Sequence, residues 1–258
     1  KKRLGASISA MVAVLLPLSL IACSLLWYNY ARFGSIFEFG HRYQLTGPSL
    51  PADYKDISSA TYVIPNLYAY VFRPPSLSRE FPFLTVPWVK ENMWPSFIRL
   101  PAHYYYTEPV AGILLIVPLA GLTVLLLVKI FWLLINGDLS FPKSAENTDA
   151  NLLSWFCYCL LIYFIVQMSI LLVFINSAIR YLFDVSPVLI VLATLYVGRN
   201  VHMIAAKPFQ VKALAFLWVL ASLLTVISGF FIGFTGERNN FLNQNPGMYQ
   251  RLLEWFGG

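Results

Sequence analysis

The chain has 258 residues, of which 58% are hydrophobic and only 12% are charged. That is more apolar than a soluble domain of this length, so the composition excludes an ordinary soluble protein and indicates an integral membrane protein. The formal charge of +6 does not indicate a nucleic-acid partner, because the basic residues are scattered apart from the KKR at positions 1–3.

Five stretches are apolar enough to be membrane-spanning helices, since about 20 apolar residues cross the hydrocarbon core. They cover residues 6–28, 110–128, 152–175, 181–198 and 213–234. The fourth stretch is the shortest and contains Asp184 and Pro187. Proline fits best in the first turn of a helix, so we expect that helix to begin near Pro187, with Ser186 or Asp184 as its N-cap.

We therefore predict an all-α integral membrane protein with about five transmembrane helices and a large external segment that carries short interfacial helices. The predicted parts are a first transmembrane helix, an external aromatic- and proline-rich segment, a four-helix transmembrane bundle and an external tail. They cover residues 1–28, 29–109, 110–235 and 236–258. The first run lacks a small-residue cleavage site and is long enough to span, so we interpret it as a helix that is retained. The chain begins with Lys1 rather than Met, so we expect it to be a fragment of a longer protein.

The basic residues predict the orientation, because Lys and Arg in short loops stay on the cytoplasmic side. A cytoplasmic N-terminus places eight cations inside and three outside, when the seven of the long segment are set aside. That segment has nine prolines between residues 29 and 108 and is rich in Tyr, Phe and Trp. Proline excludes long helices and the aromatics favour the headgroup region, so we expect short interfacial helices near 64–72 and 86–99.

The stretch NYARFGSIFEFGHRYQLTG, residues 29–47, brings charge among aromatics directly after the first span. As a helix it would place Glu38 four residues before Arg42, the orientation that favours a salt bridge. It would then be either an interfacial elbow with solvated charges, or a site where Arg32, His41 and Arg42 hold a lipid phosphate while Glu38 orients them. Spacing alone leaves both interpretations open.

This stretch resembles one found in bacterial GT-C type glycosyltransferases, the multi-spanning enzymes that use polyprenyl-phosphate sugars. A second stretch, AIRYLFDVSPVLIVLATL at residues 178–195, is similar to a segment near the end of many such transferases, where an Arg-Tyr pair at the external mouth of a late helix precedes a Pro. The matching residues here are Arg180, Tyr181 and Pro187. The two matches cover about 40 residues of the chain. For Arg180 and Asp184, a local pair at i, i+4 is an alternative.

The resemblance implies the C-terminal portion of a transferase of the bacterial plasma membrane, with membrane lipid and a polyprenyl-phosphate sugar donor as partners. Arg42 and Arg180 would neutralise the phosphate as it leaves. The family's catalytic acid follows an early helix and has no counterpart here, so the catalytic residue is unknown and would lie in an N-terminal half. The sequence identifies no cofactor and, with three scattered histidines, no metal site; a divalent metal in that other half stays open.

Two other functions fit the sequence. A non-catalytic lipid-binding or assembly subunit would have the same apolar helices and the same aromatic segment. A transporter is less favoured, because transporters place ionisable residues near the bilayer midplane and the predicted spans have none near their centres. The sequence upstream of Lys1 would discriminate, since an Asp shortly after an earlier span would favour the transferase.

Overall fold

The structure is a computed structural model of the chain, and it divides into two compact units, Lys1–Ala52 and Asp53–Gly258. Each unit is described separately. The described residues are 2–40, 43, 57–88, 94–101, 108–123, 127, 132, 136, 148–203, 208–235 and 240–256.

The first unit contains one long helix, α1 (Lys2–Phe33), which extends past the predicted end at residue 28. It ends where Gly34 adopts a positive φ of 71°, the left-handed conformation that closes many helices. Gly40 also has a positive φ, of 86°, and residues 34–40 are not helical. The helical interpretation of the stretch after residue 29 is therefore wrong for residues 34–40.

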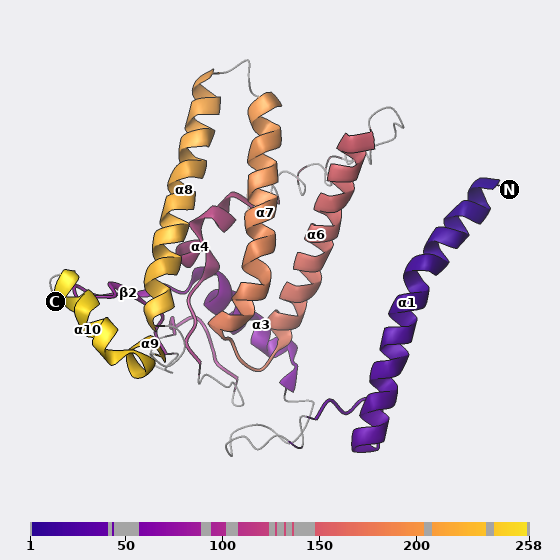
Figure 1. The fold of residues 1–258 in the computed structure, drawn as a ribbon, viewed down its shortest axis with the longest axis horizontal. Helices are drawn as coiled ribbons and strands as arrows, with labels where there is room; N and C mark the ends of the chain where they lie inside the picture. The colour runs from indigo at the N-terminus through magenta and orange to yellow at the C-terminus, as the bar shows by residue number, and fades with distance from the viewer. Residues whose placement is uncertain are drawn as a thin grey trace. The chain divides into compact units, whose positions relative to one another are not determined.

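The second unit has three long helices, α6 (Thr148–Val173), α7 (Ile179–Met203) and α8 (Pro208–Thr235), with α7 lying between the other two (Figure 1). Among the described residues, four helices of the chain are long and apolar enough to cross a membrane: α1 and these three. This confirms the predicted all-α integral membrane protein. The α7 helix is the most buried of the four, which fits its central place.

The start of α7 differs from the prediction, because Pro187 lies inside the helix and not in its first turn. The helix begins eight residues earlier, at Ile179, whose backbone N–H donates to the carbonyl of Pro109 at 2.9 Å. An internal proline costs one backbone hydrogen bond, here to the carbonyl of Phe183 four residues before it. The first residue of α7 is therefore bonded to the segment predicted to be external, residues 29–109, which is called the external segment below after that prediction.

The predicted span at 110–128 is not one continuous helix in its described part. The helix α4 (Ile113–Ile116) stops at Val117, whose φ of −130° and ψ of 68° are not helical. The following Pro118 explains the break, since proline disfavours the α conformation in the residue before it. After the break, the backbone N–H of Leu119 donates to Thr225 Oγ1 of α8 at 3.0 Å. Non-helical backbone at membrane depth is tolerated where such contacts satisfy it.

The segment predicted to be external is helical over η2 (Ala60–Tyr62), α3 (Val63–Leu67) and η3 (Tyr68–Phe72), close to the first predicted interfacial helix. Its inner side is buried in the bundle rather than exposed along its length. The second predicted helix, at 86–99, is not observed in the described residues 86–88 and 94–99, where Trp88 instead forms an antiparallel bridge with Pro109. A short hairpin lies between the two regions, with strands β1 (Ser76–Leu77) and β2 (Leu84–Thr85). The chain ends in α9 (Asn240–Gln244) and α10 (Pro246–Trp255).

Gly112 lets the segment before α4 pack directly on the external segment. A Cβ at this position would lie 2.5 Å from the backbone oxygen of Val71, and backbone cannot move aside cheaply. Its N–H also donates to the carbonyl of Arg73 at 2.7 Å. Gly112→Ala is expected to destabilise the protein by about 2 kcal/mol through overpacking. Thermal unfolding in detergent measures this, with Gly121→Ala as the control, because a Cβ there makes only an ordinary contact, 3.8 Å from Leu114. Equal midpoints for the two variants would contradict the close packing.

Candidate functional site

The site lies where α6 ends and α7 begins, and Asn66 of α3 forms its base. The side chain of Asn66 is fully buried, and its Nδ2 donates to the carbonyls of Leu171, Leu172 and Phe174, at 3.0, 3.1 and 2.6 Å. The backbone N–H of Ser59 donates to the remaining carbonyl in this run, that of Val173, at 2.8 Å. The last carbonyls of a helix have no partner within the helix, so the external segment caps the end of α6.

Tyr70 holds the connection between the two helices. Its buried hydroxyl donates to the carbonyl of Asn176 at 3.4 Å and accepts from the backbone N–H of Ala178 at 3.3 Å. The next N–H, that of Ile179, donates to the carbonyl of Pro109. These bonds involve groups more than 65 residues apart in sequence. They fix the first turn of α7 against the external segment, so side chains on that turn have a defined position.

Arg180 projects from this first turn and forms a salt bridge with Glu108. Its Nη2 lies 2.6 Å from Glu108 Oε1, and it also donates to the hydroxyl of Tyr181 at 3.4 Å. The guanidinium carbon lies 5.1 Å from the centre of the Tyr181 ring, a cation–π distance. The Arg180 side chain is 51% exposed, whereas that of Glu108 is only 12% exposed. A fixed carboxylate therefore orients a guanidinium that still reaches solvent.

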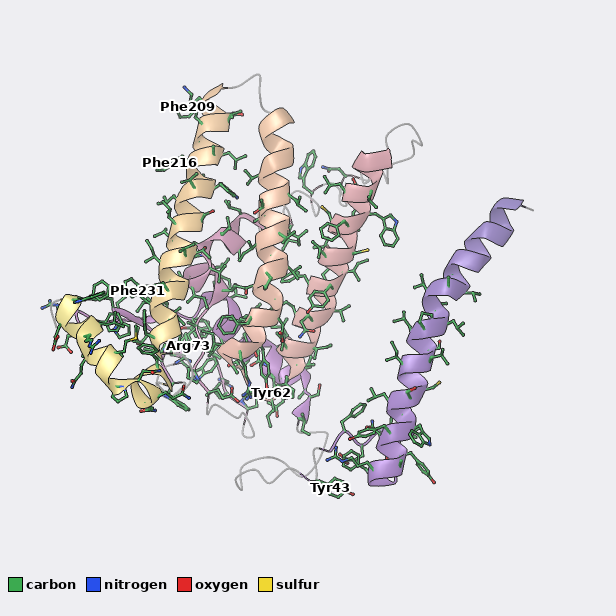
Figure 2. The ribbon with its side chains drawn as sticks, viewed as in Figure 1. Tyr43, Tyr62, Arg73, Phe209, Phe216 and Phe231 are labelled. Carbon is green, nitrogen blue, oxygen red and sulfur yellow. The ribbon has the colours of Figure 1, made fainter. Side chains whose placement is uncertain are left out.

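A second arginine, Arg73, lies inside the protein near the same end of the bundle, the end where Tyr62 also lies (Figure 2). Its side chain is 2% exposed. One guanidinium nitrogen donates to the carbonyl of Trp88 at 3.4 Å, and the guanidinium carbon lies 5.6 Å from the centre of the Trp94 ring. Because Trp88 forms the bridge with Pro109, Arg73 supports the segment that carries Glu108. A buried charge of this kind requires such partners.

The other predicted site residues of the second unit lie beside Arg180. Tyr181 is partly buried, and its ring packs edge-on against Phe174 with the ring centres 6.0 Å apart. Asp184 is exposed on the next turn of α7, and its backbone carbonyl accepts from the hydroxyl of Tyr163 at 3.5 Å. The ion pair of Arg180 thus joins two distant segments, through Glu108, instead of two turns of one helix.

The predicted site residues of the first unit have local partners. Arg32 Nη1 donates to the hydroxyl of Tyr28 at 2.8 Å, and the guanidinium carbon lies 5.0 Å from the centre of the Phe33 ring. Glu38 is buried, and its Oε1 accepts from the backbone N–H of Gly40 at 2.8 Å. His41 and Arg42 lie outside the described residues, as does any pair between Glu38 and Arg42.

Asn66, Tyr70, Arg73 and Glu108 are the site residues that the sequence analysis missed. Asn66 and Tyr70 were assigned to an interfacial helix, and a polar residue in the run VIPNLYAYVF was the available signal. Glu108, the acid next to Pro109 and just before an apolar run, was a similar signal. Among the described residues, no group of three or more His, Cys, Asp or Glu side chains could hold a metal ion.

The comparisons with known proteins give no family for this chain. No protein-family model matches the chain, and neither a curated protein nor a solved structure matches it at a significant level.

Proposed function

We propose that the chain is the C-terminal portion of a membrane glycosyltransferase that uses a polyprenyl-phosphate sugar on the external face of the membrane. The catalytic acid would come from an N-terminal half. The observation that supports this most directly is the half-exposed guanidinium of Arg180, which Glu108 orients at the end of an apolar helix. The arrangement suits an anionic lipid head whose tail stays in the bilayer.

The chemistry of the donor fits this position. A guanidinium presents a planar fork of donors that can bind two phosphate oxygens at once. Phe183 follows Arg180 by three residues, so the two side chains share a face of α7, and Phe183 is 62% exposed. In this proposal Arg180 binds the phosphate while the prenyl chain lies along Phe183. Negative charge grows on the phosphate as the sugar leaves, so a positioned cation stabilises the transition state more than the ground state.

The proposed location is the bacterial plasma membrane with the start of α1 in the cytoplasm. With this orientation the start of α7, and so Arg180, lies at the external face. The basic residues at positions 1–3 and the cations around the connection from α7 to α8, Arg199, Lys207 and Lys212, support it, because both groups would then be cytoplasmic.

A binding measurement tests the proposal. Purified protein in nanodiscs is titrated with a polyprenyl-phosphate sugar, with polyprenyl phosphate and inorganic phosphate as competitors. Arg180→Ala is expected to weaken binding at least about 10-fold, the effect of losing a charge-assisted hydrogen bond. Arg79→Ala is the control, since Arg79 is an exposed cation in the β1–β2 hairpin. Equal affinities for wild type and both variants would refute the assignment. If inorganic phosphate were the only effective competitor, the site would bind phosphate without recognising the lipid.

The pairing of Arg180 with Glu108 also supports a second function, that of a non-catalytic lipid-binding or assembly subunit in which the ion pair is structural. Glu108→Gln separates the two. If Glu108 orients Arg180 toward a donor, this variant should change donor affinity several-fold with the unfolding midpoint nearly unchanged, because the Arg180 partner is half exposed and the pair then contributes little to stability. A lower midpoint with unchanged affinity would favour the structural role. Donor titration and thermal unfolding of the same preparation measure both quantities.

A further inference from the structure

The C-terminal helix α10 presents two unlike surfaces away from the protein. Met248, Arg251 and Trp255 recur at i, i+3 and i+7 and therefore share one face. Met248 is 60% exposed and Trp255 is 83% exposed, and Arg251 between them is exposed as well. The polar residues Gln250 and Glu254 are exposed on a different face. A large aromatic ring left this open in water is costly, so the first face requires an apolar partner.

The third face of α10 attaches the helix to the end of α8. The ring of Phe256, which follows the helix, stacks on Phe81 with the ring centres 5.2 Å apart and the planes at 6°. Tyr249 meets the same ring at 5.4 Å and donates its hydroxyl to the carbonyl of Phe81 at 3.4 Å. Phe81 in turn lies 4.9 Å from Phe234, in the last turn of α8. The rings of Phe81, Tyr249, Phe256 and Phe234 thus hold α10 level with the end of a membrane span.

A helix that spans the membrane ends near the boundary between hydrocarbon and headgroups. Few residues of α8 are fully buried, and large apolar side chains are exposed along its length, among them Phe209 and Phe216 near one end (Figure 2) and Phe230 in its last two turns. Lipid is therefore the neighbour of α8, and its boundary lies beside α10. Tryptophan favours this boundary, and arginine favours the phosphates just outside it.

We infer that α10 is an interfacial helix that lies on the membrane surface, with Met248 and Trp255 in the outer acyl region, Arg251 at the lipid phosphates and Gln250 and Glu254 in water. The partner is the bilayer that surrounds α8. This inference does not depend on the proposed glycosyltransferase function.

Spin labels in the full chain test this inference. Cys23, Cys157 and Cys159 are replaced by alanine, and one label is placed at position 255 through Trp255→Cys or at position 250 through Gln250→Cys. In liposomes, we expect the label at 255 to collide several-fold more with oxygen, relative to a water-soluble nickel chelate present on both sides, than the label at 250. Gln250 is the matched control because it lies on the same helix and is exposed.

Two results would overturn the inference. Equal and high nickel accessibility at 255 and 250 would place the whole helix in water. Low accessibility of 255 to both reagents would mean that protein, from a second copy or another partner, covers the face. Met248→Cys repeats the measurement on the same face without removing Trp255, so a folding defect of the Trp255 variant does not leave the question open.

Discussion

Replacement of Arg180 by alanine is expected to lower sugar transfer by the proposed transferase about 100-fold, the scale of one lost electrostatic contact with the developing charge. The side chain is half exposed and lies in the first turn of α7, so its removal leaves the buried contacts of Asn66 and Tyr70 in place. The loss should therefore appear in the turnover rate and not in expression. Transfer from a radiolabelled donor to an acceptor, at saturating donor, measures it.

Arg180→Lys and Arg79→Ala complete the design of this experiment. Lysine keeps the charge but loses the fork that binds two oxygens, so we expect an intermediate rate. Arg79→Ala should be as active as wild type, because it removes a cation of the exposed hairpin. Activity of Arg180→Ala within twofold of wild type would rule out a role in the transition state. The same substitution at Arg42, the other cation proposed from the sequence, is expected to have a similar effect.

Asn66→Leu is expected to lower the free energy of unfolding by about 3 kcal/mol, because it leaves buried carbonyls at the end of α6 without a donor. Leucine has nearly the shape of asparagine, so the variant removes the donor without opening a large cavity. The side-chain NH2 of Asn66 donates to three carbonyls here, and the backbone N–H of Ser59 donates to that of Val173. Reversible unfolding in mixed micelles with increasing sodium dodecyl sulfate measures the change.

Asn245→Leu is the matched control for this prediction. Asn245 precedes α10, is exposed, and makes no side-chain cap bond, so its replacement should change stability by less than about 0.5 kcal/mol. If the Asn66 and Asn245 variants unfold at the same concentration of detergent, the capping of α6 by Asn66 contributes nothing measurable. In that event, the position of Arg180 would have to depend on Tyr70 and Glu108 instead.

The spans could be predicted from the sequence because they depend on a local property, the length of an apolar run. The helix α8 contains the whole predicted run 213–234, and α6 contains the run 152–175 except for its last two residues. The helix α1 extends beyond its run to Phe33, next to Gly34. The break at Val117 was also visible, since Pro118 restricts the residue before it. The prediction of a continuous span at 110–128 counted apolar residues only and did not use this signal.

The site could be predicted only in part. Arg180 and Tyr181 were identified through a short pattern, and the structure places them side by side at the start of α7. The partner of Arg180 is Glu108, 72 residues away, and no spacing rule connects residues at that separation. Asn66 and Tyr70 bind backbone carbonyl and amide groups, which leave no mark in the sequence. Interactions between distant segments therefore needed the fold.

Photolabelling tests the central claim, that the first turn of α7 binds the phosphate head of a polyprenyl-phosphate sugar through Arg180. A donor with a photoreactive group on its sugar is bound to the full protein in nanodiscs, irradiated and mapped by mass spectrometry of the digested chain. We expect labelled peptides from residues 174–184 and the neighbourhood of Glu108, with labelling abolished by excess unlabelled donor and by Arg180→Ala. Labelling confined to α8, or labelling that unlabelled donor does not reduce, would contradict the claim.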